Sequence, residues 1–154
     1  MRAGRLAAVV AASALVMSLT GCESAEEKKA ESALKQTADM STCQGDAKPV
    51  GRPFAGGFPR GFTFPPRTTV YHVEDRGAAG VIATGISSAP FASVLHYLNH
   101  DAVAAGFKIT EGETEEHDAE ANWAGNGFRG RWAIRQSAQC SGQTVVQVLA
   151  SKTR

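Results

Sequence analysis

The sequence predicts an α+β domain, in which an antiparallel sheet of about five strands packs one face against a single helix. Two observations predict this class. Short segments rich in β-branched residues flank one segment whose apolar residues repeat with helical period. Since one amphipathic helix cannot enclose a core by itself, we expect it to lie across the sheet, with the order ββαβββ along the chain.

The first two strands are expected at residues 68–74 and 81–86, joined as a hairpin by a Gly-containing connection. A helix is expected next, because Ser88 suits its N-cap, Pro90 suits its first turn and Gly106 suits its end. The apolar stripe that would face the sheet consists of Phe91, Val94, Leu95, Leu98, Ala102 and Ala105.

Three or four further strands are expected at 107–114, about 120–128, 129–136 and 144–150. An acidic run at the first of these connections could attract calcium, but it lacks the spacing and central glycine of a dedicated calcium loop. We expect instead a solvated hairpin, partly neutralised by arginines across the sheet. The run consists of Glu111, Glu113, Glu115, Glu116, Asp118 and Glu120.

Residues 43–66 are rich in Gly, Pro and Phe, a composition that precludes long regular elements. The segment contains Phe54, Phe58, Phe62 and Phe64. Large aromatic side chains need a buried environment, and the core of the domain itself is the favoured one. An exposed aromatic recognition loop is the alternative.

The N-terminus carries Arg2 and Arg5, followed by a largely apolar run at residues 6–19 that is too short for a permanent membrane anchor. This pattern is typical of a cleaved export signal. The sequence LTGC at residues 19–22 resembles the lipobox of bacterial lipoproteins, which implies that Cys22 is diacylated, becomes the new N-terminus and anchors the protein to a membrane. The alternative is a plain secretory signal, in which Cys22 is an ordinary residue.

We therefore expect a signal peptide at 1–21, a lipidated Cys22 with a polar, partly helical tether at 22–41, and one α+β domain at 42–154. Removal of the signal, which carries two arginines and no acidic residue, changes the formal net charge from +1 to −1. This balance argues against nucleic acid as a partner. The expected location is the extracytoplasmic face of the cell membrane.

Cys43 and Cys140 remain once Cys22 is lipidated, and in an oxidising compartment they are expected to form a disulfide. The bond would join the beginning of the domain to its last strand. Two buried free thiols are the alternative.

His96 and His100 have the i,i+4 spacing of a metal site, but they lie on the face of the expected helix opposite the apolar stripe, so two solvated histidines are favoured. The sequence contains no nucleophile elbow, zincin helix or phosphate loop. We therefore expect a non-catalytic protein without metal or cofactor. The alternative is an enzyme or metal-binding protein with four polar side chains converging in one pocket. Those side chains would be His72, Glu74, His96 and His100.

One expected strand carries Arg129, Arg131 and Arg135 in alternation with apolar residues. The period of two puts the arginines on one face if Trp132 and Ile134 face the core. Such a row of guanidinium groups suits binding of phosphate or carboxylate. The alternative is that these arginines pair with the acidic run and only keep the face soluble.

Beyond the lipobox-like residues, distinctive segments occur at 58–66 (FPRGFTFPP), 105–107 (AGF), 127–134 (GFRGRWAI) and 140–144 (CSGQT). They resemble small secreted lipoproteins of actinobacterial type, a group without an assigned activity. The resemblance covers roughly two thirds of the chain. It implies an exported, membrane-anchored domain and carries over no catalytic residue.

These observations together predict a lipid-anchored module of the cell envelope that binds another envelope protein or an anionic envelope polymer. A carrier of a small apolar ligand between helix and sheet is a further alternative.

Overall fold

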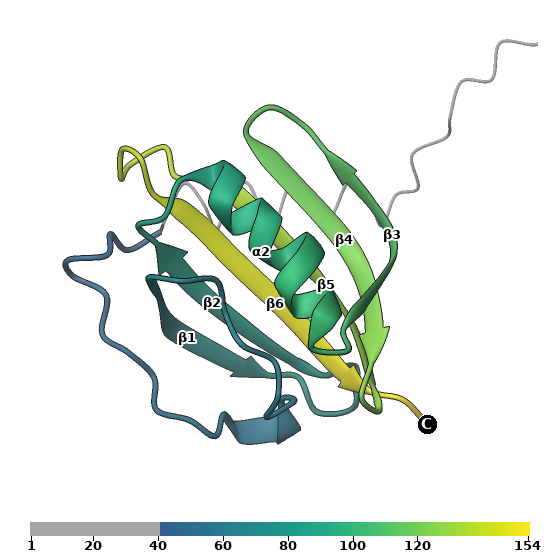
Figure 1. Cartoon of the computed structure of the whole chain (residues 1–154). Helices are drawn as coiled ribbons and strands as arrows, with labels where there is room; N and C mark the ends of the chain where they lie inside the picture. Colours follow the sequence, from purple (N-terminus) through teal and green to yellow (C-terminus); the bar gives the residue numbers. More distant parts are fainter. Residues whose placement is uncertain (1–40) are drawn as a thin grey trace, which may run out of the picture.

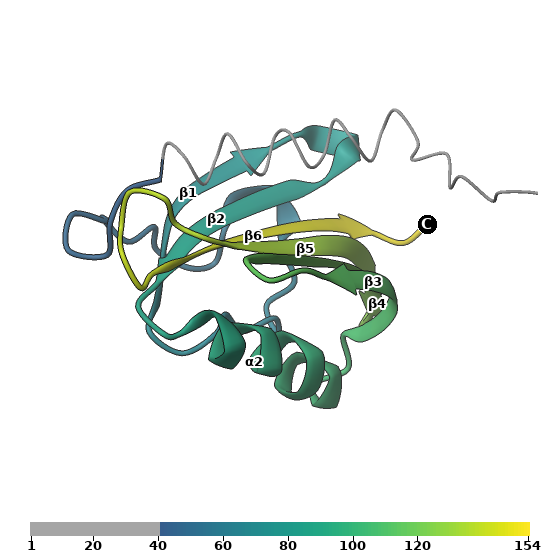
Figure 2. The ribbon, with the colours of Figure 1, turned by 90° about the horizontal axis from the view of Figure 1, so that it is seen from above.

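A six-stranded antiparallel sheet with the strand order β1-β2-β6-β5-β4-β3 forms the centre of the computed structural model, which describes residues 41–154 (Figure 1). One helix, α2 (Phe91–Ala104), lies across one face of the sheet (Figure 2). The strands are β1 (Thr68–Asp75), β2 (Val81–Ser87), β3 (Lys108–Thr114), β4 (Asp118–Gly125), β5 (Phe128–Gln136) and β6 (Thr144–Lys152). The predicted α+β class is confirmed.

The predicted count of about five strands is one short, and the described elements follow the order ββαββββ. The residues after the helix form four strands, because β4 and β5 are separate strands, and the acidic run lies in the expected hairpin of β3 and β4. The hairpin of β1 and β2 is present as expected, closed by the short 3₁₀ turn η2 (Gly77–Ala79). A second short turn, η1 (Ala55–Gly57), interrupts the aromatic segment.

The signal peptide, Cys22 and the tether up to residue 40 lie outside the described residues. Within residues 41–154, no helix is long and apolar enough to cross a membrane.

Helix α2 ends where the sequence predicts but begins differently. Pro90 is its N-cap, and no side chain caps the first turn. The prediction of Ser88 as N-cap is wrong, because the Ser88 amide donates to the carbonyl of Arg67 and so holds this residue in the connection before the helix. At the other end, Gly106 has a φ of 97° and Phe107 follows it into the core, as expected for a glycine stop.

The core lies between the helix and the sheet. The helix contributes Val94, Leu98 and Ala102 as buried residues, with two further stripe residues, Phe91 and Leu95, packed at the margin. Ala105 of the expected stripe is exposed instead, because it lies beyond the last helical residue.

The phenylalanines of residues 54–64 also belong to this core, which confirms the favoured interpretation of that segment. Phe62 is fully buried, with its ring centroid 5.0 Å from that of Phe107 and 5.4 Å from that of Trp123. Phe54 and Phe58 are buried beside it. These rings belong to the same cluster as Val94 and Leu98 of the helix, so the aromatic segment adds to the core that the single helix covers.

Candidate functional site

The arginine row projects from the face of β5 that points away from α2. Trp132 and Ile134 are buried in the helix-side core, so the alternating arginines lie on the opposite face. The structure therefore places Arg129, Arg131 and Arg135 as the period of two predicts, on the sheet face without the helix.

Two members of the row are neutralised by the neighbouring strand. Arg131 forms an ion pair with Glu120, and Arg135 pairs with Asp118 through Nη2 and Oδ2 at 2.7 Å. All four side chains are about one quarter exposed or less. The alternative interpretation, pairing with the acidic run, thus holds for these two arginines, since each guanidinium group already pairs with a carboxylate.

Arg129 differs from them, since it is exposed and lines an open hollow of about 740 Å³ at the end of the sheet. The hollow lies between the β1–β2 hairpin and the end of β6. Its other lining residues are Ala78, Ala79, Ser151, Lys152, Thr153 and Arg154. Three residues with cationic side chains therefore line this hollow, and none of its lining residues is acidic. The Lys152 side chain extends toward Gly57.

Lys152 and Arg154 are the residues that the sequence analysis missed. Arg129 is opposite Ser151 in the β5–β6 ladder, so antiparallel pairing brings the basic C-terminal residues beside it. On the other side of the hollow, the Ser151 hydroxyl donates a hydrogen bond to the carbonyl of Ala79 at 2.8 Å, which holds the β1–β2 turn beside the end of β6. The sequence shows Lys152 and Arg154 close together, but their place beside Arg129 depends on the register between β5 and β6.

The four side chains of the enzymatic alternative do not converge. His72 and Glu74 lie on β1 and alternate with Val73, which packs against the helix-side core, so they are on the sheet face away from α2. His96 and His100 are exposed on α2, with ring centroids 4.4 Å apart. Among the described residues, no group of three or more His, Cys, Asp or Glu side chains is placed to hold a metal ion.

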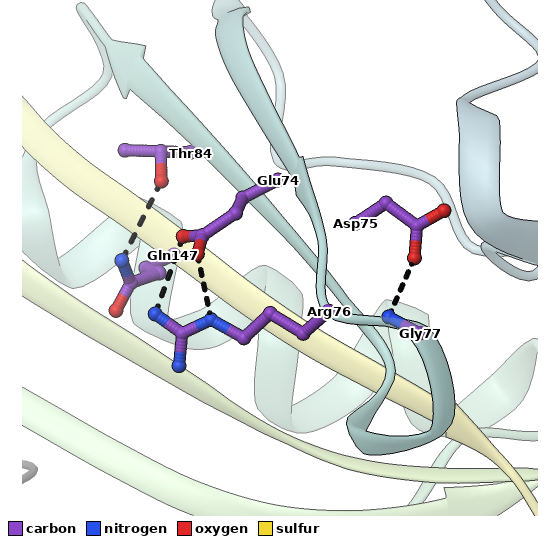
Figure 3. Close-up of polar contacts among 6 residues, drawn as sticks. All are labelled: Glu74, Asp75, Arg76, Gly77, Thr84 and Gln147. Atoms are coloured by element: carbon purple, nitrogen blue, oxygen red, sulfur yellow. Dashed lines mark hydrogen bonds and ion pairs between the residues drawn. The ribbon is translucent and has the colours of Figure 1, made fainter.

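The Glu74 carboxylate already has a partner, Arg76, which follows the end of strand β1. Arg76 donates to the Glu74 carboxylate through Nε at 2.9 Å and Nη2 at 3.2 Å (Figure 3). These hydrogen bonds lower the pKa of the Glu74 carboxyl below its ordinary value. A carboxyl held ionised in this way is poorly suited to act as a general acid near neutral pH.

A second, smaller concavity lies against the aromatic segment. Its volume is about 300 Å³, and its lining residues are Arg52, Pro53, Phe54, Phe58, Pro59 and Arg60. Arg52 is part of the wall: its guanidinium carbon lies 4.8 Å from the centroid of the Phe54 ring, and its Nη2 donates to the carbonyl of Phe62 at 2.7 Å. Burial lowers the pKa of Arg52, yet an arginine remains charged.

No protein-family model, no curated protein and no solved structure matches this chain. The fold and the site therefore define a class only: an α+β domain with one helix on a six-stranded antiparallel sheet and a basic hollow at the sheet end.

Proposed function

We propose that the protein is a lipoprotein anchored through Cys22 at the extracytoplasmic face of the cell membrane, and that its domain binds phosphate or carboxylate groups of an anionic envelope polymer. The domain acts without catalysis. The observation that carries this proposal is the hollow lined by Arg129, Lys152 and Arg154. Guanidinium and ammonium groups recognise such anions through charge-assisted hydrogen bonds.

The binding test is co-sedimentation of the protein with purified cell-wall polymer at two ionic strengths. Each exposed cation near an anionic surface contributes about 1 kcal/mol, so neutralising three of them reduces affinity roughly a hundredfold at low salt. The variant carries Arg129→Gln, Lys152→Gln and Arg154→Gln. The difference from the parent protein should shrink at higher ionic strength because salt screens these charges.

A matched control removes the same charge elsewhere, with Lys48→Gln, Arg60→Gln and Lys108→Gln, three exposed positions outside this hollow. The control protein should bind nearly as the parent does. Equal weakening of both variants would show that only net charge matters, and unchanged binding by the hollow variant would refute the site. Vesicles of anionic lipid, tested in parallel, separate a lipid headgroup from a wall polymer as the source of the anion.

Membrane anchoring is tested separately with labelled fatty acid in cells. The label should enter the protein, and Cys22→Ala should abolish it. A Cys22→Ala protein that still carries label would refute lipidation at this residue.

The concavity beside Phe54 and Phe58 supports a second candidate, binding of a small apolar ligand. Its volume is at the lower limit of ordinary ligand sites. The space between helix and sheet, where the sequence suggested such a ligand, is occupied by rings of Phe62, Phe107 and Trp123. An apolar fluorescent probe should bind the parent protein and be lost in Phe58→Ala, while a variant of the basic hollow retains it.

A further inference from the structure

Arg52 is held against the wall of the smaller concavity by contacts with the aromatic segment. Its guanidinium carbon lies 4.8 Å from the ring centroid of Phe54, 5.6 Å from that of Phe64 and 6.0 Å from that of Phe58. These are distances at which a cation and an aromatic ring attract each other. The Nη2 group also donates to the carbonyl of Phe62 at 2.7 Å. Ring and carbonyl contacts together fix the orientation of the guanidinium group.

The Arg52 guanidinium has no carboxylate partner in the domain. Arg52 and Arg60 are the two cationic residues that line the concavity, and neither forms an ion pair with another residue of 41–154. A guanidinium group carries five N–H donors. Within the same residues, Arg52 uses two of them, on the carbonyl of Phe62 and, through Nη1 at 3.4 Å, on the carbonyl of Arg60. Three donors and the whole positive charge therefore remain without a protein partner there.

The rest of the concavity is apolar. Pro53, Phe54, Phe58 and Pro59 complete its lining, and none of its lining residues is acidic. Arg52 itself is exposed, so a molecule that enters from solvent can reach its guanidinium group. A concave apolar wall beside an unpaired cation matches a ligand that has an apolar body and an anionic group.

The setting of this cation favours an anionic ligand over water. The rings withdraw part of the guanidinium group from solvent, and this burial lowers the pKa of Arg52. A partly desolvated cation attracts a ligand anion more strongly than a fully exposed one, because water and salt screen the pair less. Since the contacts with Phe54 and Phe62 already fix the side chain, binding has little side-chain freedom left to remove.

We propose that this concavity binds a small carboxylate with an apolar body, the carboxylate pairing with Arg52 and the body packing against Pro53, Phe54 and Phe58. The proposal rests on the second candidate function given above and names the class of ligand for that site. A carboxylate fits the planar fork of a guanidinium group, which can donate two parallel hydrogen bonds to it. The volume of about 300 Å³ suits a compact body such as a bicyclic ring.

The first test compares two probes of nearly the same shape, naphthoate and its uncharged amide naphthamide, in fluorescence titrations of the full chain at neutral pH. Naphthoate should bind more tightly than naphthamide by roughly tenfold or more, the effect expected of hydrogen bonds between charged groups. Equal affinities would overturn the proposal and leave the candidate of an apolar ligand intact. Binding of neither probe would overturn both.

The second test assigns the carboxylate to Arg52. Arg52→Gln should weaken naphthoate binding by roughly tenfold or more and leave naphthamide binding within about twofold of the parent. Arg67→Gln is the matched control, because Arg67 is exposed and lines neither concavity; it should bind both probes as the parent does. Unchanged naphthoate binding by Arg52→Gln, or its loss in the double variant Arg129→Gln, Arg154→Gln, would place the anion elsewhere and overturn the proposal.

Arg52→Lys separates binding from support of the wall, since Arg52 also contacts the rings. Lysine keeps the charge but lacks the planar fork. This variant should therefore bind naphthoate less tightly than the parent and more tightly than it binds naphthamide. Equal loss of both probes in Arg52→Lys and Arg52→Gln would show that Arg52 only supports the aromatic wall, which would overturn the proposal. The comparison of the two probes needs no variant and remains decisive even if these substitutions disturb the segment.

Discussion

Cys43 is joined to Cys140 by a disulfide across a separation of 97 residues, with their Cα atoms 5.5 Å apart. The bond ties the segment before β1 to the loop between β5 and β6. A hydrogen bond from the Gln44 amide to the Gln143 side chain, at 2.8 Å, supports the same contact. The beginning of the described domain is thus held to the β5–β6 loop both covalently and by polar contacts, whereas the sequence analysis expected the bond to reach the last strand.

Removing this disulfide should lower the free energy of unfolding by about 4 kcal/mol, since a loop of about 100 residues is no longer closed in the unfolded chain. The measurement is urea denaturation of the double variant Cys43→Ser, Cys140→Ser. The parent protein in a strong reductant is the control and should unfold at the same urea concentration as the variant. Equal stability of the oxidised and reduced parent would contradict the prediction.

The pairing of these cysteines could be predicted from the sequence because the expected lipidation of Cys22 and the expected oxidising compartment left only one combination. The amphipathic helix and the β1–β2 hairpin were predictable for another reason, since their signals are local: period, Gly106 and a Gly-containing connection. The number of strands after the helix was less evident, because the strands expected at about 120–128 and 129–136 adjoin. In the structure β4 and β5 are separate and meet in a tight turn at Asn126 and Gly127.

The candidate site was predicted in part only. The period of two places Arg129, Arg131 and Arg135 on one face, but it does not predict which of them form ion pairs with a carboxylate. That depends on register, which puts Asp118 opposite Arg135 and Ser151 opposite Arg129. The register between consecutive strands therefore decides which arginine remains available to a ligand.

The ion pair of Arg131 and Glu120 should stabilise the fold modestly. Its side chains are 26% and 21% exposed, so we expect a coupling of about 1 kcal/mol in a double-mutant cycle with Arg131→Gln and Glu120→Gln. Arg129→Gln is the control and should leave the urea midpoint unchanged, because Arg129 is exposed and forms no ion pair with another residue of 41–154. A coupling near zero would mean that the pair contributes nothing to stability.

Gly130 is needed where β5 passes close to β6 and Trp123. A Cβ at this position would meet the carbonyl oxygen of Leu149 and lie 2.6 Å from the Trp123 ring. Gly130→Ala should therefore lower the free energy of unfolding by about 1–3 kcal/mol, the range for overpacking a buried site. Gly51→Ala is the matched control, since nothing lies within 4 Å of its added Cβ. Equal urea midpoints for the two variants would contradict the prediction.

Tyr71 should make stability depend on pH in the alkaline range. Burial raises the pKa of its phenol, and a hydrogen bond with the Thr42 backbone only partly opposes this. Because the folded-state pKa lies above the unfolded value of about 10, the stabilising contribution is complete below that pH and is lost as pH rises through the folded-state pKa. Urea denaturation of the parent and of Tyr71→Phe between about pH 8 and pH 11 measures this. The difference at pH 8 reports the lost hydroxyl contacts, and above pH 10 the parent should lose stability more steeply than the variant. Parallel pH profiles would show that the phenol titrates equally in the folded and unfolded chains.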